Sequence, residues 1–470
     1  MLIFPGVSPF GYRHIKFQKV HIIHLSPGAN RILSKSIVIQ KRRNYAQKRK
    51  HSILHLQKRT IMGEYMVRCV SDGSEQPPYV LSCPNDNSLL RAEYVARRLE
   101  LKDLPGIWRF YNWLPVKGII PKASAGSVTY RSIDLAREMG LKNLYISFSG
   151  YWPERARRAT MPTGSFKDLE APPTMQRLKE RGDNSTLVVA SAGNTARAFA
   201  QLASLTGQRL ALFVPEKALH RMWLTTDNSE SSPVNLICVN GDYADSISIA
   251  EKVQLLPGFT PEGGARNIAR RDGMGTVMLD AALTTGRIPD HYFQAVGSGT
   301  GGISAWEASM RLIGDGRFGS MPPRLHLAQN LPNAPIYYAW TGKEPSPAMP
   351  EMFDDVLFNR RPPYAIPGGV KDALDATNGR VYGITDDEAS KAKRLFEKSE
   401  GIDILNAPGV AVAALVKALQ SGTIGREEVI LLNVTGGGIS RLKEDFSLSV
   451  MKCDVSVSSA EEAVEFLEGR

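Results

Sequence analysis

Short apolar runs alternate with amphipathic helical patterns through most of the chain, and this alternation limits the folds available to it. Residues 234–239 form an apolar run followed by a helical pattern over 242–253, and residues 292–296 are followed in the same way by 303–312. A strand-helix-strand pattern also spans 187–214. Uninterrupted apolar runs are typical of strands buried on both faces of a parallel sheet. The sequence therefore predicts an open α/β fold with ligands at the carboxyl ends of its strands.

The net charge of +11 is carried by the first part of the chain. Residues 1–61 contain 13 Lys and Arg and no Asp or Glu, so the remainder has 58 − 13 = 45 basic against 47 acidic residues, a net charge of −2. A nearly neutral body gives no reason to expect a nucleic-acid partner. No segment approaches the run of about 18 apolar residues that a membrane helix needs, so we expect no membrane association.

The basic extension over residues 1–61 has three interpretations. A transit peptide and a disordered nucleic-acid-binding arm would both be basic and poor in acidic residues. The third interpretation is a start codon assigned too far upstream, with Met62 or Met66 as the true first residue. We favour the third, because a segment of this composition has little means of joining a core.

Only four cysteines occur, at positions 69, 83, 238 and 453. Their wide spacing argues against a disulfide scaffold and fits a reducing compartment, the cytoplasm. Cys69 and Cys83 flank a turn-rich stretch that could be half of a zinc ribbon, but zinc would need two more ligands and no CxxC pair is present. We therefore expect unbridged structural cysteines and no metal.

Residues 162–167 read Pro-Thr-Gly-Ser-Phe-Lys and lead into a turn over 168–170. A lysine here could be a solvated residue of a first helical turn. A basic side chain is, however, electrostatically misplaced at a helix start, and a lysine held there loses its proton more easily, as a nucleophilic amine must. Lys167 is therefore a candidate catalytic residue.

Two further loops follow apolar runs. Residues 191–195 read Ser-Ala-Gly-Asn-Thr, which is either a plain helix cap or an anion cradle of backbone N–H groups, with the Asn194 amide as a donor. Residues 297–302 hold four glycines, so that backbone amides can close on a phosphate. This loop lacks the Walker lysine and the full GxGxxG spacing, so a nucleotide site is not expected. Thr435 begins a Thr-Gly-Gly-Gly stretch after a fourth apolar run.

Together these loops resemble those of the fold-type-II pyridoxal-phosphate (PLP) enzymes, and specifically the threonine synthase family, from about residue 106 to 445. The resemblance is carried by Gly-Ile-Trp-Arg-Phe at 106–110, Thr-Gly-Ser-Phe-Lys-Asp at 163–168 and Ser-Ala-Gly-Asn-Thr-Ala at 191–196. It implies a fold similar to the tryptophan synthase β subunit, with PLP between two open parallel-sheet domains. It also leads us to expect a homo-oligomer.

The resemblance implies a role for each loop. Lys167 would hold PLP as a Schiff base, Asn194 would contact the ring hydroxyl and Thr435 the pyridine nitrogen. The cofactor phosphate would be bound by the glycine-rich loop, that is by Gly297, Ser298, Gly299, Thr300 and Gly301. The substrate carboxylate would be bound by the asparagine loop, that is by Ser191, Ala192, Gly193 and Thr195.

The domains implied are four: the extension over 1–61, a small β-rich segment over 62–105, a catalytic region over 106–450 and a C-terminal tail or helix over 451–470. The catalytic region would comprise two α/β subdomains, of which the smaller spans roughly 180–255.

Departures from the family pattern bear on the substrate. The lysine motif continues as Leu-Glu-Ala-Pro-Pro over 169–173, where threonine synthases usually have Arg-Gly. This stretch, with 151–154 and 270–276, resembles the branch of the family that makes L-cysteate from O-phospho-L-serine and sulfite on a route to coenzyme M. The alternatives are a threonine synthase acting on O-phosphohomoserine, a serine or threonine ammonia-lyase, and a nucleic-acid-binding protein with a vestigial α/β body.

Arg197 is a candidate for binding the leaving phosphate or the sulfite. It lies three residues after Asn194, so on a helix the two side chains share a face. A solvated helix arginine is the alternative. Arg155, Arg157 and Arg158, just before the lysine loop, could serve instead.

Overall fold

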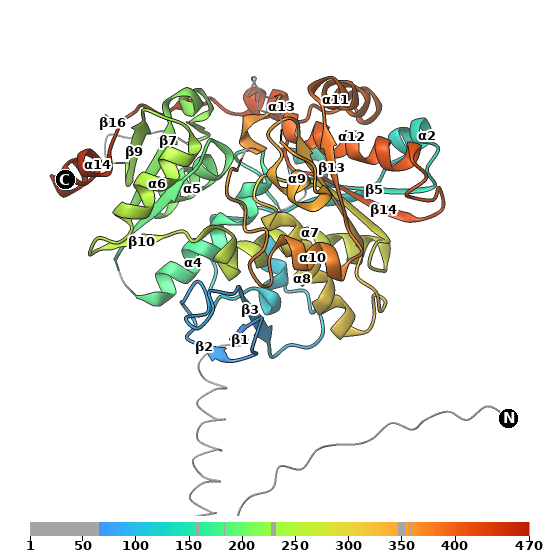
Figure 1. The fold of residues 1–470 in the computed structure, drawn as a ribbon, viewed down its shortest axis with the longest axis horizontal. Coiled ribbons are helices and arrows are strands. Elements are labelled where there is room, and N and C mark those ends of the chain that lie inside the picture. Colours follow the sequence, from blue (N-terminus) through green and yellow to red (C-terminus); the bar gives the residue numbers. More distant parts are fainter. Residues whose placement is uncertain are drawn as a thin grey trace, which may run out of the picture. The chain divides into compact units, whose positions relative to one another are not determined.

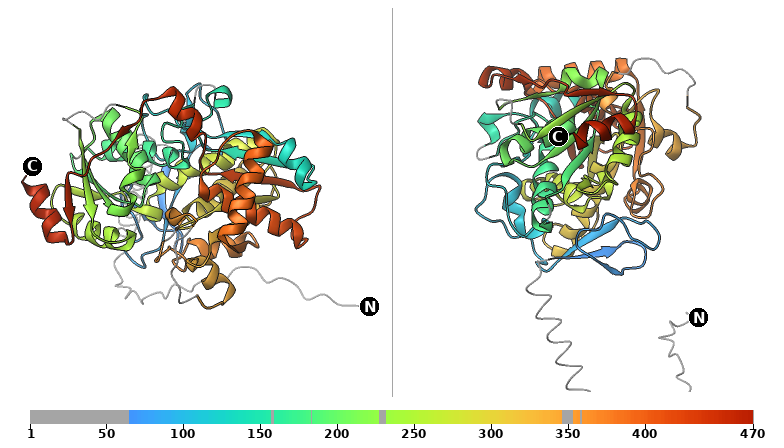
Figure 2. Two further views of the ribbon diagram at one scale, coloured as in Figure 1. Left: turned by 90° about the horizontal axis from the view of Figure 1, so that it is seen from above. Right: turned by 90° about the vertical axis from the view of Figure 1, so that its left-hand side faces the viewer.

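Two parallel-stranded sheets, as predicted, organise the computed structural model, together with two small antiparallel sheets (Figures 1 and 2). The structure describes residues 65–156, 159–182, 184–226, 232–345, 353–357 and 359–469. The extension over 1–61 and both Arg157 and Arg158 lie outside these residues. Within the described ranges, none of the helices combines the length and apolar character that crossing a bilayer requires.

The larger sheet has six strands in the order β13-β12-β11-β14-β5-β4, and only the pairing of β4 with β5 is antiparallel. Its strands are β4 Val128–Arg131, β5 Asn143–Phe148, β11 His291–Ala295, β12 Arg324–Asn330, β13 Arg380–Ile384 and β14 Val429–Val434. The apolar run at 292–296 and the run that precedes Thr435 are therefore β11 and β14.

Successive residues of these strands face two different apolar cores, because side chains alternate across a strand. Tyr292 faces the core that holds α7 and α8, and Phe293 faces the core that holds α2, α11 and α12. In Figure 1 these two groups of helices lie on opposite sides of the sheet. The helices are α2 Asp134–Met139, α7 Ile268–Thr285, α8 Thr300–Asp315, α11 Asp386–Glu400 and α12 Asn406–Gln420.

The smaller sheet is entirely parallel, in the order β10-β6-β7-β9-β16. Helices α4 and α5 pack on one face, and α6 and α14 on the other. The strands are β6 Thr186–Ala190, β7 Leu210–Pro215, β9 Val234–Val239, β10 Phe259–Pro261 and β16 Val455–Val457. The helices are α4 Ala171–Arg181, α5 Asn194–Thr206, α6 Tyr243–Val253 and α14 Ala460–Glu468.

This smaller unit extends beyond the segment 180–255 expected from the sequence. It also takes β10 and, from the C-terminal segment, both β16 and α14, where we expected a tail or a helix. Figure 1 shows α14 at the edge of this unit. The periodicity of β16 covers only three residues, too few to be recognised, although Val457 is fully buried beneath α6.

A three-stranded antiparallel sheet near the start of the described chain packs against α7 and α8. It has the order β2-β1-β3, with β1 Tyr65–Cys69, β2 Glu75–Gln76 and β3 Leu90–Tyr94. Tyr94 donates a hydrogen bond to Asp272 of α7 (2.5 Å), and Arg91 pairs with Glu307 of α8 (3.0 Å). The β-rich segment therefore braces the helices beneath the larger sheet.

The remaining elements are short. A two-stranded sheet pairs β8 Trp223–Leu224 with β15 Ser449–Val450. The short helices are α3 Pro153–Ala156, α9 Pro335–Thr341, α10 Val370–Ala376 and α13 Ile439–Asp445. Short 3-10 helices occur at Gly106–Trp113, Phe166–Leu169, Glu216–Arg221, Gly264–Arg266 and Asp355–Leu357.

Candidate active site

The structure brings the four candidate loops to one cavity. A space of about 110 Å³ is lined by Lys167, by residues 191–195 after β6, by residues 297–301 after β11 and by Thr435 after β14. Three of these segments stand at the carboxyl ends of parallel strands, where α/β sheets place their ligands. The lysine loop reaches the same edge because Ser165 bridges to Gly436 and Phe166 donates its backbone N–H to the Thr435 carbonyl (3.0 Å).

The glycine-rich loop is shaped to hold an anion close to backbone. Gly299 has a φ of 80° and precedes the first turn of α8, so the free N–H groups of that turn face the cavity end of the helix. A Cβ at Gly299 would collide with Val370. The hydroxyls of Ser298 and Thr300 are 2.7 Å apart. Backbone amides, two hydroxyls and a helix N-terminus are the groups that bind a phosphate.

Lys167 stands at the start of a short 3-10 helix capped by Ser165, whose hydroxyl accepts the Lys167 backbone N–H at 3.2 Å. Its Nζ lies 3.4 Å from a carboxylate oxygen of Glu170, one helical turn later. The Glu170 side chain is fully buried, whereas that of Lys167 is 24% exposed. The amine is therefore held at the border between the protein interior and the cavity.

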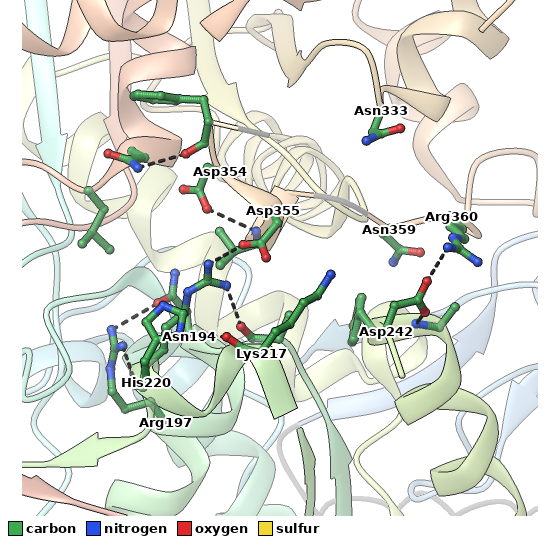
Figure 3. Close-up of a pocket in the computed structure, with 18 of the residues that line it drawn as sticks. Asn194, Arg197, Lys217, His220, Asp242, Asn333, Asp354, Asp355, Asn359 and Arg360 are labelled. Atoms are coloured by element: carbon green, nitrogen blue, oxygen red, sulfur yellow. Dashed lines mark hydrogen bonds and ion pairs between the residues drawn. The ribbon is translucent and has the colours of Figure 1, made fainter. Parts of the chain in front are cut away.

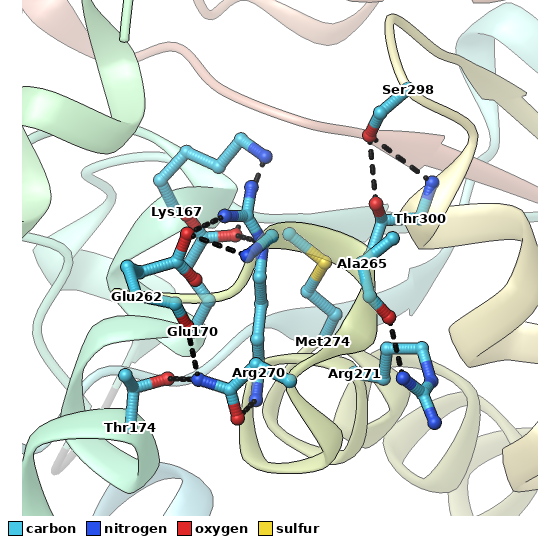
Figure 4. Close-up of polar contacts among 12 residues, drawn as sticks. Lys167, Glu170, Thr174, Glu262, Ala265, Arg270, Arg271, Met274, Ser298 and Thr300 are labelled. Carbon is cyan, nitrogen blue, oxygen red and sulfur yellow. Dashed lines mark hydrogen bonds and ion pairs between the residues drawn. The ribbon is translucent and has the colours of Figure 1, made fainter. Parts of the chain in front are cut away.

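A buried chain of charges continues from Lys167 (Figure 4). Arg270 of α7 lies with its Nε 3.0 Å from Glu170 and donates from a terminal nitrogen to Glu262 at 2.7 Å. Burial lowers the pKa of the Lys167 amine, the Glu170 carboxylate opposes this shift and the Arg270 guanidinium adds to it. The net lowering favours the unprotonated amine that can attack a carbonyl group.

Asn194 begins α5, and its side chain is oriented by Arg197 (Figure 3). A terminal nitrogen of Arg197 donates to the Asn194 amide oxygen at 3.1 Å and to the Thr163 carbonyl at 2.9 Å. Because a guanidinium only donates, the oxygen of the Asn194 amide must face Arg197, which leaves the NH₂ group free to donate elsewhere. This orientation suits an amide that binds a ring oxygen.

Arg197 itself is buried, at 3% exposure, and its guanidinium lies over Trp223 with 4.2 Å between its central carbon and the ring centroid. Burial lowers its pKa to about 10, opposed by the nearby Asp168 carboxylate. Asp168 in turn accepts hydrogen bonds from the backbone and hydroxyl of Thr163. Arg197 thus joins the asparagine loop to the lysine loop.

A second and larger pocket, of about 1200 Å³, adjoins the first (Figure 3). Both are lined by Asn194 and Tyr243, so the two are continuous at these residues. Arg197 lines only the larger pocket. Arg221 pairs with Asp355 there at 2.5 Å and donates to the Ala192 carbonyl at 3.0 Å. The large pocket offers a path by which polar substrates can reach Lys167.

Of the three arginines that could serve instead of Arg197, only Arg155 lies within the residues that the structure describes. Its guanidinium stacks over Tyr130 and Trp152, at 4.3 and 4.5 Å from the ring centroids. It contributes to neither of the two cavities. Arg157 and Arg158 lie outside the described residues.

Comparisons with known proteins identify the family of this chain. Residues 157–436 match the family described as "Pyridoxal-phosphate dependent enzyme". The chain is 56% identical to the cysteate synthase of Methanococcoides burtonii over 405 residues, which are 86% of this chain and 96% of that protein. The chain belongs to the cysteate synthase family of PLP-dependent enzymes. The cysteate synthase of Methanothrix thermoacetophila is also 56% identical, over 87% of this chain and 99% of that protein.

Solved structures extend the comparison to the fold. Maize serine racemase aligns with a TM-score of 0.51 over 68% of this chain and 91% of that structure, at 15% identity. A PLP-dependent aspartate racemase aligns with a TM-score of 0.50 at 16% identity. The fold is therefore that of the fold-type-II PLP enzymes, and the cofactor of this family is PLP.

The residues of the cavity fit this cofactor. A lysine amine of lowered pKa, a free asparagine NH₂ and a glycine-rich helix start suit the aldehyde, the ring hydroxyl and the phosphate of PLP. Sequence reasoning did not foresee Glu170, Arg270, Glu262 or Tyr243. The stretches at 169–173 and 270–276 contain Glu170 and Arg270, but the contact between these two residues joins segments 100 residues apart and is not encoded locally. Glu262 and Tyr243 lie outside both stretches.

Proposed function

We propose that this chain forms L-cysteate from O-phospho-L-serine and sulfite, with Lys167 as the residue that carries PLP. The observation on which this rests is that Lys167, Thr435 and two loops suited to binding anions, at 191–195 and 297–301, line one cavity. The support for the substrate is the 56% identity to cysteate synthases over nearly their whole length.

The overall reaction is a substitution at Cβ that needs no oxidant or reductant. PLP, when bound, draws electrons away from Cα of the attached amino acid and so acidifies the Cα proton. The Cβ–O bond breaks with its electron pair leaving on the phosphate, and a lone pair of the sulfite sulfur forms the new C–S bond. One proton is removed from Cα and later returned.

Lys167 is the group placed to move this proton. With its Nζ free of the cofactor, Lys167 would take the Cα proton and hold it beside Glu170, whose carboxylate lies 3.4 Å away. The same atom then returns the proton to Cα. Asn194 would hold the ring, the backbone amides of residues 191–195 the substrate carboxylate, and Thr435 the pyridine nitrogen.

The experiment that tests the substrate is a phosphate-release assay with purified protein. O-phospho-L-serine plus sulfite should release phosphate and yield cysteate detectable by mass spectrometry, and omission of sulfite should remove the cysteate. Turnover of O-phosphohomoserine to threonine, with no cysteate from phosphoserine, would contradict the proposal.

The role of Lys167 is tested by Lys167→Ala. We expect this variant to lose both the visible absorbance of covalently held PLP and all measurable turnover, because its ε-amino group is the one that lines the cavity between the loops. Lys179→Ala, on the exposed side of α4, is the matched control and should keep both. Covalent PLP in the Lys167→Ala protein would refute the assignment.

A homo-oligomer in the cytoplasm completes the proposal. The four cysteines are all free thiols, as a reducing compartment requires. Large apolar side chains such as Leu255, Met321 and Val95 are well exposed and could be covered in an oligomer. Light scattering of the purified holoenzyme measures its mass, and a monomer would contradict this part.

A further inference from the structure

Two turns beside the N-terminal sheet repeat the same sequence pattern. Residues 69–74 read Cys-Val-Ser-Asp-Gly-Ser and residues 83–88 read Cys-Pro-Asn-Asp-Asn-Ser, so that each has Cys, then Asp three residues later, then Ser after two more. Gly73 and Asn87, between the Asp and the Ser, have left-handed φ values of 71° and 63°.

The two turns also share their hydrogen bonds. In each, the N–H of the cysteine donates to the serine carbonyl, at 2.9 Å for Cys69 and 3.0 Å for Cys83. The cysteine carbonyl accepts the N–H of the residue four positions later, at 3.1 and 2.9 Å respectively. Because the turn occurs twice, the cysteine of one turn is equivalent to that of the other, and so is the aspartate. The repeat can therefore direct these side chains toward a common point.

The donor atoms of the two turns do converge. The Sγ atoms of Cys69 and Cys83 and a carboxylate oxygen of Asp86 all lie within 4.8 Å of one another. Both cysteines are buried, and Cys69 Sγ is 4.0 Å from Asp86 Oδ1. The hydroxyls of Ser71 and Ser88, 2.6 Å apart, tie one turn to the other.

This geometry is close to that of a tetrahedral metal site. With Zn–S bonds of about 2.3 Å, the ligand atoms of such a site are roughly 3.7 Å apart, which a small adjustment of these side chains would reach. The backbone N–H of Ser88 donates to Asp86 Oδ1 at 3.0 Å, which orients this carboxylate. Asp72 holds the equivalent place in the first turn, where its Oδ1 accepts the Ser74 backbone N–H at 2.9 Å and the Ser74 hydroxyl at 2.6 Å.

We propose that Cys69, Cys83 and Asp86 bind one Zn²⁺ ion, with Asp72 or a water molecule as the fourth ligand. From the sequence we expected no metal, because no CxxC pair is present. In each turn, however, an Asp lies three residues after the Cys, which is the position of the second cysteine in a CxxC pair. Thiolate and carboxylate oxygen are both ligands of zinc in proteins.

The ion would act as a structural staple for the N-terminal sheet against the catalytic body. The second turn is already anchored there, since Arg266 donates to the Asn87 carbonyl at 2.8 Å and Leu89 donates to the Pro367 carbonyl at 3.1 Å. Arg266 directly precedes α7, which carries Arg270 into the active site. Loss of the ion should therefore lower stability before it affects chemistry.

The first test is metal analysis of full-length holoenzyme purified without chelators. We expect about one zinc per chain in the wild type, and at least about a tenfold lower content in Cys83→Ser and in the milder Asp86→Asn. Cys453→Ser is the matched control, because Cys453 lies beside Cys238 but belongs to no group of metal-ligating side chains among the described residues, and it should keep the wild-type content.

A second test uses wild-type protein, so that it does not depend on how the variants fold. Protein stripped by a chelator should melt at least about 5 °C lower and recover with Zn²⁺. Addition of Co²⁺ instead should give the intense visible bands of a tetrahedral site with thiolate ligands. A metal-free native protein that also lacks these bands after Co²⁺ addition would overturn the proposal.

Discussion

At the residue scale, we propose that Arg197 acts on the site both by orienting Asn194 and through its charge. Its guanidinium is already engaged by the Asn194 amide oxygen, the Thr163 carbonyl and the Arg221 carbonyl. A guanidinium with these contacts still lines the large pocket. It can therefore orient the asparagine and still present positive charge to an incoming anion.

We expect Arg197→Ala to slow turnover of phosphoserine with sulfite by at least about tenfold, the equivalent of roughly 1.4 kcal/mol, while covalent PLP is retained. If Arg197 works through Asn194, its loss also shifts the absorbance maximum of bound PLP, and the double variant with Asn194→Ala is no slower than the worse single variant. Arg137→Ala, on the exposed face of α2, is the control. If Arg197→Ala showed wild-type kinetics with both substrates, the role of Arg197 would be purely structural.

We propose that Glu170 helps to set the protonation of Lys167. Burial lowers the pKa of the lysine amine and the Glu170 carboxylate raises it, so Glu170→Gln should lower this pKa further. In PLP-free protein, the acylation rate of Lys167 should then reach its half-maximum at a lower pH than in the wild type, as measured by peptide mass spectrometry across a pH series. Glu262→Gln should shift the midpoint less, because Glu262 contacts Arg270 rather than the amine. An unchanged midpoint in Glu170→Gln would contradict this account.

At the element scale, one glycine stands at each end of α8, Gly299 as its N-cap and Gly314 in its last turn. Gly299 before its first turn has a φ of 80° and lies against Val370, whereas Gly314 in its last turn is exposed with open space around it. We expect Gly299→Ala to weaken PLP retention at least tenfold, because the added Cβ strains the phosphate-binding turn. Gly314→Ala should keep PLP and gain up to about 1 kcal/mol of unfolding free energy. PLP titration measures the retention of the cofactor, and denaturant-induced unfolding measures the free energy of unfolding. Equal PLP retention in the two variants would contradict the role given to Gly299.

The elements near the site could largely be predicted from the sequence because their signals are local. The helix of the strand-helix-strand pattern over 187–214 is α5 Asn194–Thr206, and the helix expected at 242–253 is α6, which Asp242 caps together with Asp245. What could not be predicted depends on contacts between distant segments. The pairing of β16 with β9 spans more than 200 residues, and the approach of Arg270 to Glu170 spans 100. No periodicity encodes such contacts, so the second layer of the site emerges only from the packed structure.

At the scale of the whole molecule, the active site is built between the two parallel sheets. The asparagine loop follows β6 of the smaller sheet, and the glycine-rich loop and Thr435 follow strands of the larger one. Arg221 and Asp355 form an ion pair between these two parts at the large pocket. Residues of both parts must therefore fold together before the cavity exists, and the first described residue that lines it is Ser165.

This leads us to propose that removal of residues 1–61 leaves the catalytic unit intact. The unit that spans Gly63–Arg470 contains each described strand and helix of the site, and the segment removed carries 13 of the 58 basic residues and no acidic ones. We expect a variant that begins at Met62 to retain PLP and to turn over phosphoserine and sulfite at a rate within about twofold of that of the full chain.

Because the net charge of this variant falls from +11 to −2, any affinity of the full chain for RNA or DNA should be lost at the same time. Filter binding measures the affinity and the phosphate assay the activity. Insoluble or inactive truncated protein would show that the segment serves the fold, and unchanged nucleic-acid binding would place that binding on the body instead.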